Sequence, residues 1–507
     1  MSLKRILKLL AAFLAGQGVT IVTQLLVPPL FLHRYAHGIE MYGEWLALTA
    51  TVSYLSALNY GIQNYANNQM TIHYNRGELN ETKAVQSSAL WLISILVVAL
   101  SAAASTILAM PVGRWLGLRF VSSSAASLTA FLMVMQLAIG FLLGFFANSF
   151  MVIGQAHRGQ LWINGQRLTC AFALAAAVWE RASFPVLAAT QCITVFAFML
   201  AAVADLRLKA PFLSPSLRHG SVRQILSQLK PSGHFMLISV TTFLVWQGPL
   251  LIIQKILGPA SVAVFALSRT VFSMSRQLLA VASYSLGQDI THLIGQRNWL
   301  QLRRLYELSE KVVLFLTPIS TIGTLLLCPM LFSIWLHQRS IYDPAMCMLL
   351  AIASAVIGIK EHKVQFQWSS NEHERFARFT LVAYTVMLAA SAFSIRRTGI
   401  NSFVCIWIVT EVVIAIYVVY QNLELFPPDL HVSVRPMFQL FWVLAIAFPL
   451  VVWPVWHSAH WGIFKVLAVA VVATGALAVV DYFSFGLGEV RAVVMGKIRR
   501  RLATSER

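Results

Sequence analysis

The sequence is built from fourteen apolar runs, each of about twenty residues, separated by short polar segments. A helix of that length spans about 30 Å, the thickness of the hydrocarbon core of a bilayer. The chain is 58% hydrophobic and 11% charged, with a mean hydropathy of +0.71, which excludes an ordinary soluble domain. We therefore predict an all-α polytopic membrane protein with about 14 transmembrane helices.

The distribution of basic residues predicts the orientation of these spans. An even number of spans places both termini on one side of the membrane. If that side is the cytoplasm, 26 of the 38 Lys and Arg residues fall in cytoplasmic segments and 8 in outer loops, a bias typical of membrane proteins. The formal charge of +19 then reflects orientation and contacts with anionic lipids, so we expect no nucleic-acid partner. The predicted spans are 11–32, 43–64, 88–110, 127–153, 161–179, 184–205, 233–257, 260–286, 312–336, 344–359 with an extension, 379–395, 400–421, 437–456 and 461–483.

An offset of 220 residues relates the first two spans to the seventh and eighth. The matching positions are Pro29 and Pro249, Gly38 and Gly258, and the polar loops 75–88 and 295–308. Two six-helix lobes related by an internal repeat, with a substrate path between them, are typical of transporters. The predicted organisation is an N-terminal lobe (1–206), a cytoplasmic linker (207–232), a C-terminal lobe (233–430), and two extra C-terminal helices with a basic tail (431–507).

Two arginines, Arg269 and Arg276, lie within the apolar run 260–286. Seven residues are two helical turns, so both side chains share one face, about 10 Å apart along the axis. Two arginines at a helix centre cost about 5 to 7 kcal/mol on insertion scales, so this helix requires a polar interior to face. Guanidinium groups suit phosphate oxygens, which predicts an anion clamp. The alternative is an internal ion pair, although no acidic residue in the same or the preceding span neutralises both arginines.

Three other ionisable residues lie within or beside predicted spans. Arg167 is about six residues into the run 161–179, so it either lines a cavity or reaches the interface with its head group. Glu411 is the only acidic residue near the centre of a predicted span. It either pairs with an arginine or couples transport to a proton gradient. Lys255, at the outer end of the run 233–257, lies at the interface or along the outer cargo path.

Amide side chains crowd one half of the second span and the turn after it. They hydrogen-bond sugar hydroxyls or pack against neighbouring helices, and packing is the favoured interpretation for most of them. The substrate-binding candidates among the amides are Asn59 and Asn64, together with Gln24 of the first span. The full set in this half of the second span and the following turn is Asn59, Gln63, Asn64, Asn67, Asn68 and Gln69.

The sequence lacks the patterns of an enzyme. It has no GxxxxGK[ST] phosphate-binding loop and no HExxH or other metal-ligand spacing. Glu361 and His362, together with nearby acidic residues and His373, are best explained by a solvated cytoplasmic loop after the run 344–359. We therefore expect no catalytic residues, no metal and no cofactor.

Three segments near the N-terminus resemble a known family. These are Pro28–Leu32, Tyr42–Trp45 (Tyr-Gly-Glu-Trp) and Asn59–Asn64, within roughly the first ninety residues. They resemble polysaccharide biosynthesis proteins, the O-antigen (Wzx-like) flippases of the multidrug/oligosaccharidyl-lipid/polysaccharide (MOP) exporter superfamily. The resemblance implies a two-lobed fold that alternates between inward-open and outward-open states.

The resemblance also implies a substrate and a location. Such a flippase moves an undecaprenyl-pyrophosphate-linked oligosaccharide from the cytoplasmic to the outer leaflet of the bacterial inner membrane, for lipopolysaccharide or related surface polysaccharide. Both termini are then cytoplasmic, and membrane lipids and the polysaccharide polymerase machinery are candidate partners. Members of the family are thought to use a cationic cavity, for which Arg269, Arg276 and Arg167 are the candidates here.

Two other functions compete with this interpretation. A multidrug or cation antiporter on the same scaffold would require acidic and aromatic cavity walls, whereas these spans contain more basic than acidic residues. A membrane polysaccharide polymerase or ligase generally carries a large outer loop with functional residues. The longest predicted outer loop here, 111–126, has about sixteen residues.

Overall fold

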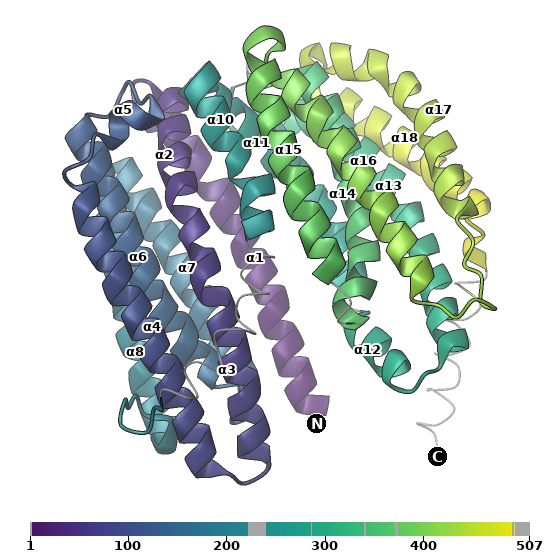
Figure 1. The fold of residues 1–507 in the computed structure, drawn as a ribbon. Helices are drawn as coiled ribbons and strands as arrows, with labels where there is room; N and C mark the ends of the chain where they lie inside the picture. The colour runs from purple at the N-terminus through teal and green to yellow at the C-terminus, as the bar shows by residue number, and fades with distance from the viewer. Residues whose placement is uncertain are drawn as a thin grey trace. The chain divides into compact units, whose positions relative to one another are not determined.

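The computed structural model describes residues 3–221, 240–284, 286–338, 341–370, 374–488 and 491. The regular elements within these ranges are helices (Figure 1). The chain divides into two compact units, Met1–Ala263 and Val264–Arg507. Eleven of the described helices are long and apolar enough to cross a membrane. The all-α, multi-pass architecture predicted from the sequence is therefore confirmed.

The first unit is a bundle of long helices. Its tightest neighbours are α6 with α8 and α1 with α7, and α4 packs on both α3 and α6. Part of the predicted linker also belongs to this bundle, because Gln86 and Trp91 of α4 donate side-chain hydrogen bonds to the carbonyls of Leu213 and Leu217. The elements are α1 (Leu3–Arg34), α2 (Gly38–Ser53), η1 (Tyr54–Ser56), α3 (Ala57–Asn75), α4 (Leu79–Ile107), α5 (Val112–Leu116), α6 (Ser123–Ser149), α7 (Ala156–Trp179), α8 (Phe184–Lys209), η2 (Pro211–Leu213) and α10 (Gly248–Leu257).

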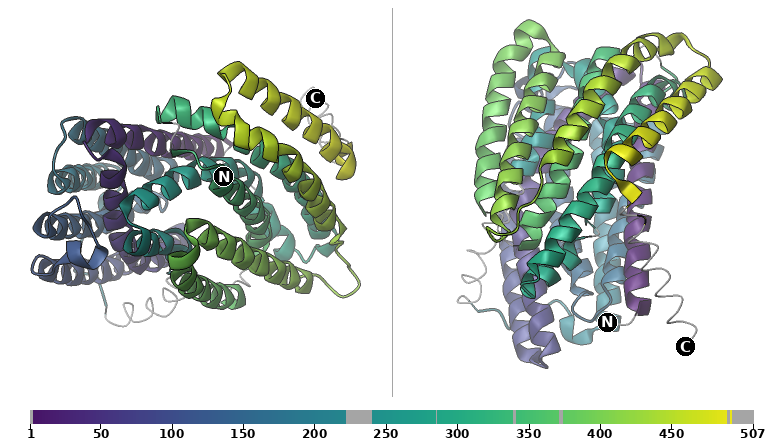
Figure 2. Two further views of the ribbon diagram at one scale, coloured as in Figure 1. Left: turned by 90° about the horizontal axis from the view of Figure 1, so that it is seen from above. Right: turned by 90° about the vertical axis from the view of Figure 1, so that its right-hand side faces the viewer.

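The second unit is organised around α13 and α14. α16 packs closely on α14 and on α15, while α17 and α18 both pack on α13, as the two views of Figure 2 show. The elements are α11 (Pro259–Tyr284, which begins in the first unit), α12 (Gly287–Gly295), α13 (Trp299–Trp335), α14 (Pro344–Ser370), α15 (Glu374–Thr398), α16 (Ile400–Glu424), α17 (Arg435–His457), η4 (Ser458–His460) and α18 (Ile463–Ser484).

The predicted spans fall on these helices, several of which begin well before the predicted start; α13, for example, begins at Trp299 and not at 312. Three segments need separate mention. The run 43–64 is two helices, because the 3-10 turn η1 separates α2 from α3. The run 344–359 continues as helix to Ser370. Residues 222–239 lie outside the described part of the chain. They include the end of the predicted linker (207–232) and the start of the run 233–257. The predicted boundaries of the two lobes remain a prediction.

The helix boundaries recur at the 220-residue offset. α3 and α12 end at residues 75 and 295, and α4 and α13 begin at residues 79 and 299. The turns between them also match in backbone conformation. Gly77 and Arg297 both have positive φ, 80° and 53°, and the capping residues Glu78 and Asn298 have φ/ψ of −86°/69° and −87°/71°. These local matches are what a duplicated unit predicts.

The Tyr-Gly-Glu-Trp motif at the start of α2 has a packing role. A Cβ atom on Gly43 would lie 1.9 Å from the carbonyl oxygen of Pro259, so only glycine permits this close approach. The rings of Tyr42 and Trp45 flank Phe31 of α1, with centroids 5.5 and 6.1 Å away. The motif therefore joins α2 to α1 and to the start of α11 within the first unit.

Glu44, the third residue of the motif, fastens a loop. Its buried carboxylate accepts hydrogen bonds from the backbone N–H groups of Arg119 at 2.5 Å, Phe120 at 3.0 Å and Val121 at 3.1 Å. A buried carboxylate is stable only when its oxygens are satisfied in this way. The charge of Glu44 is thus used to hold the loop between α5 and α6.

Candidate functional site

The first unit contains an open cavity of about 450 Å³ lined by α2, α3, α6, α7 and α8. That volume lies within the range of small-molecule sites, about 300 to 1,000 Å³. Its wall combines apolar residues, including Trp45 and Phe141, with a set of uncharged polar groups and one cation. No Asp or Glu is among the lining residues. The polar lining residues are Thr49, Ser53, Gln63, Gln136, Asn148, Gln166, Arg167 and Gln191.

Among the lining residues that the structure describes, Arg167 alone carries a charge. It lies halfway along the 24-residue helix α7, about 16 Å from the first residue at 1.5 Å per residue. That is deeper than the sequence predicted, because α7 begins at Ala156, five residues before the predicted span. No hydrogen bond or ion pair joins Arg167 to any residue that the structure describes. Its guanidinium is therefore available to a ligand.

The amide side chains in the cavity wall make hydrogen bonds within the protein, but these use only some of their donors and acceptors. Gln63 donates to the carbonyl of Phe141 at 2.8 Å and accepts from Asn148 at 3.3 Å. Gln191 donates weakly to its own helix at 3.4 Å. Each amide has two donor hydrogens and an acceptor oxygen, so the wall presents both donors and acceptors. Such a wall can hydrogen-bond hydroxyl groups while Arg167 binds an anion.

The amides singled out in the sequence and the amides that line this cavity overlap only in part. Gln63 lines it, whereas the side chains of Asn59 and Asn64 lie outside the described residues. Gln24 of α1 is half-buried and is not among the lining residues; its Oε1 atom is buried without a described partner. The sequence interpretation missed four lining amides, each on a helix that is otherwise largely apolar: Gln136, Asn148, Gln166 and Gln191.

The second unit contains a buried set of charges on α14. The sequence interpretation placed Glu361 and His362 in a solvated loop, and this is wrong. The helix continues through them to Ser370, and Lys360, His362 and Lys363 are 8%, 1% and 1% exposed. The helix tolerates these charges because neighbouring helices supply counter-charges.

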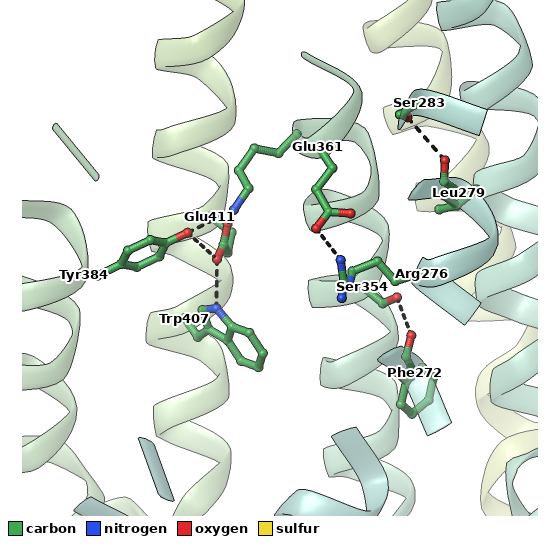
Figure 3. Close-up of polar contacts among 10 residues, drawn as sticks. Phe272, Arg276, Leu279, Ser283, Ser354, Glu361, Tyr384, Trp407 and Glu411 are labelled. Atoms are coloured by element: carbon green, nitrogen blue, oxygen red, sulfur yellow. Dashed lines mark hydrogen bonds and ion pairs between the residues drawn. The ribbon is translucent and has the colours of Figure 1, made fainter. Parts of the chain in front are cut away.

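Glu411 of α16 is the centre of one such arrangement. Lys360 donates from its ammonium to Glu411 Oε2 at 2.5 Å and to the Tyr384 hydroxyl at 2.9 Å. Tyr384 and Trp407 in turn donate to Glu411 Oε1 at 3.1 and 3.0 Å (Figure 3). Glu411 is fully buried. Of the two roles predicted for it, the structure shows an ion pair, although its partner is a lysine and not an arginine.

Two further ion pairs lie along α14. Arg276 of α11 donates from Nη1 to Glu361 Oε1 (Figure 3), with side chains 15% and 17% exposed. Lys363 donates to Glu310 of α13, with side chains 1% and 3% exposed. Arg276 therefore has a carboxylate partner, on a helix that is neither its own nor the preceding one. The pairing was not predicted from the sequence because Glu361 was assigned to a solvated loop.

Two predicted cationic residues have other surroundings. The Arg269 guanidinium lies 5.2 Å from the centre of the Phe265 ring, and its side chain is half-buried. The Lys255 ammonium donates to the backbone carbonyl of Trp115 at 2.9 Å, so it binds the end of α5. Arg276 thus pairs with the carboxylate of Glu361, and Arg269 lies against the aromatic ring of Phe265.

The chain matches no family model and no curated protein. It does match solved structures. Lipid II flippase MurJ in an inward closed conformation aligns with a TM-score of 0.69 at 10% identity, over 94% of this chain and 99% of that chain. An inward-facing multidrug resistance MATE family transporter of the MOP superfamily gives 0.66 at 14% identity, over 80% and 95%. A MOP superfamily transporter from Pyrococcus furiosus, described as having a binding pocket of reversed polarity, gives 0.52 at 13% identity, over 83% and 94%.

At these identities the similarity shows the fold alone. The chain has the fold of the MOP-superfamily transporters, which the N-terminal resemblance had implied. The Wzx-like family within that superfamily remains a prediction, as do the roles of the site residues.

Proposed function

We propose that this protein is a flippase that moves an undecaprenyl-pyrophosphate-linked oligosaccharide from the cytoplasmic to the outer leaflet for surface polysaccharide assembly. The observation that carries the proposal is the cavity of the first unit. Its wall has amides and hydroxyls, one arginine, and no acidic residue. That combination suits a cargo with many hydroxyl groups and a negative charge.

Charge decides between this proposal and export of organic cations. A cationic drug would meet the rings of Trp45 and Phe141 in this cavity but no acidic residue among the described lining residues, and the guanidinium of Arg167 would repel it. A phosphate or a carboxylate would instead form charge-assisted hydrogen bonds with that guanidinium, which are shorter and stronger than neutral ones. The polarity of this cavity therefore favours an anionic cargo.

We also propose two arginines of α11, in the second unit, as substrate-binding residues. Arg269 and Arg276 would bind the pyrophosphate, with Arg276 sharing its five N–H donors between the phosphate oxygens and Glu361. The polyprenyl tail would stay in lipid while the head group crosses. An inside-negative potential would favour outward movement of negative charge by about 2.3 kcal/mol per charge per 100 mV.

The proposal is tested by following substrate between leaflets in vesicles. Undecaprenyl-pyrophosphate oligosaccharide is reconstituted with the purified protein, and a membrane-impermeant glycosidase reports the fraction that becomes accessible. We expect the wild type to expose substrate faster than empty vesicles and Arg167→Ala to be much slower. Arg207→Ala, an exposed arginine at the end of α8, is the matched control and should flip normally. Equal rates with and without protein would reject the flippase.

The arginine clamp is tested in cells. Arg269→Ala and Arg276→Ala should each reduce surface polysaccharide and leave lipid-linked precursor on the cytoplasmic side, and Lys substitutions should be milder because charge persists without the planar fork. Arg276→Ala also leaves Glu361 without its partner. The variant Arg276→Ala/Glu361→Gln separates that effect from loss of binding. Normal polymer in Arg269→Ala/Arg276→Ala would reject the clamp.

A multidrug antiporter remains the competing function, because a MATE family transporter shares the fold at a TM-score of 0.66. The two functions differ in what the purified protein binds. An organic cation dye should bind weakly to the wild type, and more tightly to Arg167→Glu, if the cavity takes anions. Tight dye binding by the wild type would favour the antiporter.

A further inference from the structure

The Lys360 ammonium occupies a site built from oxygen atoms. Its nitrogen lies 2.5 Å from Glu411 Oε2 and 2.9 Å from the Tyr384 hydroxyl, at the junction of α14, α15 and α16. An anionic carboxylate and a phenol oxygen are hard ligands, the kind that bind a hard cation such as sodium. In this chain those ligands are already bound to a cation that cannot leave.

The other groups around Glu411 complete its shell without adding charge. Trp407 Nε1 donates to Oε1 at 3.0 Å, and Tyr384 donates to the same oxygen at 3.1 Å. The nearest further charges are Glu361, the neighbour of Lys360 on α14, and its partner Arg276. This second pair is neutral overall. Both oxygens of Glu411 are therefore hydrogen-bonded, and the protein supplies one full counter-charge.

We infer that Lys360 is a tethered counter-ion that takes the place of a diffusible coupling cation at Glu411. A carboxylate at this depth requires a positive charge or a proton. Because the ammonium is covalently attached, the pair takes up and releases no cation during a transport cycle. If the protein is the flippase proposed above, its export is then driven by the membrane potential acting on the cargo and not by a sodium or proton gradient acting on Glu411.

The first test needs no substrate and measures thermal unfolding of the purified full-length protein. The midpoint is compared in sodium chloride and in choline chloride at equal ionic strength, and at pH 6 and pH 8. The wild type should have the same midpoint in both salts. Lys360→Met should be less stable by several degrees, and sodium or acid should restore part of the loss, because either one then neutralises Glu411.

The control is the double variant Lys360→Met/Glu411→Gln, which removes both charges and keeps similar shapes. It should again be indifferent to sodium and should resemble the wild type in its response to pH. Specific stabilisation of the wild type by sodium would overturn the inference, as would a Lys360→Met variant that responds to neither sodium nor acid. If Lys360→Met does not fold, the inference is judged from the wild type and the double variant. An unfolded double variant would overturn it, because a neutral pair of side chains would then not be enough to keep the site folded.

The second test uses vesicles that contain undecaprenyl-pyrophosphate oligosaccharide. A potassium gradient with valinomycin sets the potential, and sodium and pH are equal on both sides. Wild-type flipping should follow the potential and should ignore a sodium or pH gradient imposed at zero potential. Accumulation driven by either gradient at zero potential would overturn the inference. No flipping under any condition would count against the proposed function, and the thermal comparison alone would then decide the role of Lys360.

Discussion

The two units place the charged side chains of their helices in different surroundings. In the first unit, Arg167 faces a polar cavity and has no charged partner among the described residues. In the second unit, three glutamates around α14 each bind a cation of the chain itself. A charge within a bilayer has to be solvated by water, by a ligand or by an opposite charge. The first unit thus leaves the charge of Arg167 open to a ligand, whereas these three glutamates of the second unit are neutralised within the chain.

Breaking an internal pair should have the largest effect on stability. Lys363→Met leaves Glu310, 2% exposed, without its counter-charge. Loss of one partner of a buried pair costs about 3 to 5 kcal/mol. The double variant Lys363→Met/Glu310→Gln should recover most of that loss, since no charge remains. Unfolding in denaturant measures both variants, and a single variant as stable as the wild type would contradict the description of the second unit.

Removing the single cavity charge should affect transport and not stability. Arg167→Ala deletes charge-assisted hydrogen bonds worth about 1.5 to 3 kcal/mol, so flipping at low substrate should fall by about tenfold to a hundredfold. The unfolding midpoint should stay close to that of the wild type, because no described partner is lost. Arg167→Lys should retain part of the activity. A large loss of stability in Arg167→Ala would show that the charge has a structural role.

Filling the cavity tests the role of the first unit through the volume of the cavity and not through its charge. A Cβ atom on Gly140 meets nothing within 4 Å, so Gly140→Leu should fit into the cavity and reduce its space. We expect slower flipping with stability equal to or above that of the wild type. Gly475→Leu is the matched control, since Gly475 on α18 also has open space but lies in the second unit. Equal rates in both variants would place the cargo elsewhere.

The smallest effect is expected at Asp481 of α18, the exception to the pairing in the second unit. Its carboxylate is fully buried, and neither oxygen has a hydrogen-bond partner among the described residues. Asp481→Asn removes a charge that nothing described compensates, so the midpoint should stay the same or rise slightly. Glu411→Gln, which leaves Lys360 uncompensated, should lower it clearly. A large fall in Asp481→Asn would indicate an additional cationic partner.

Much of the fold could be predicted because apolar run length determines where helices cross a bilayer. The run 260–286 predicted α11 closely, and the 220-residue offset predicted the recurrence of the turns at Gly77 and Arg297. α14 was predicted too short because charged residues signal a loop when their partners are unknown. Glu310 and Glu411, which make those charges tolerable, are more than forty residues away from α14's lysines in the sequence.

The candidate site was less predictable because its residues come together only through the packing of helices that are distant in the sequence. Arg167 was recognised because arginine is costly in an apolar run. The amides around it were not, since a single glutamine such as Gln136 costs little and occurs in many helices. Only the packing of α6, α7 and α8 brings these amides to one wall.

The way Glu44 holds the loop between α5 and α6 has a consequence for variation among related sequences. Its carboxylate binds main-chain N–H groups at positions 119 to 121, and these are present whatever side chains stand there, proline excepted. The side chains of the loop can therefore be changed, for example to suit different surroundings at that end of the bundle. The path of the loop is kept by the hydrogen bonds to Glu44. Substitutions at Glu44 itself have no such freedom.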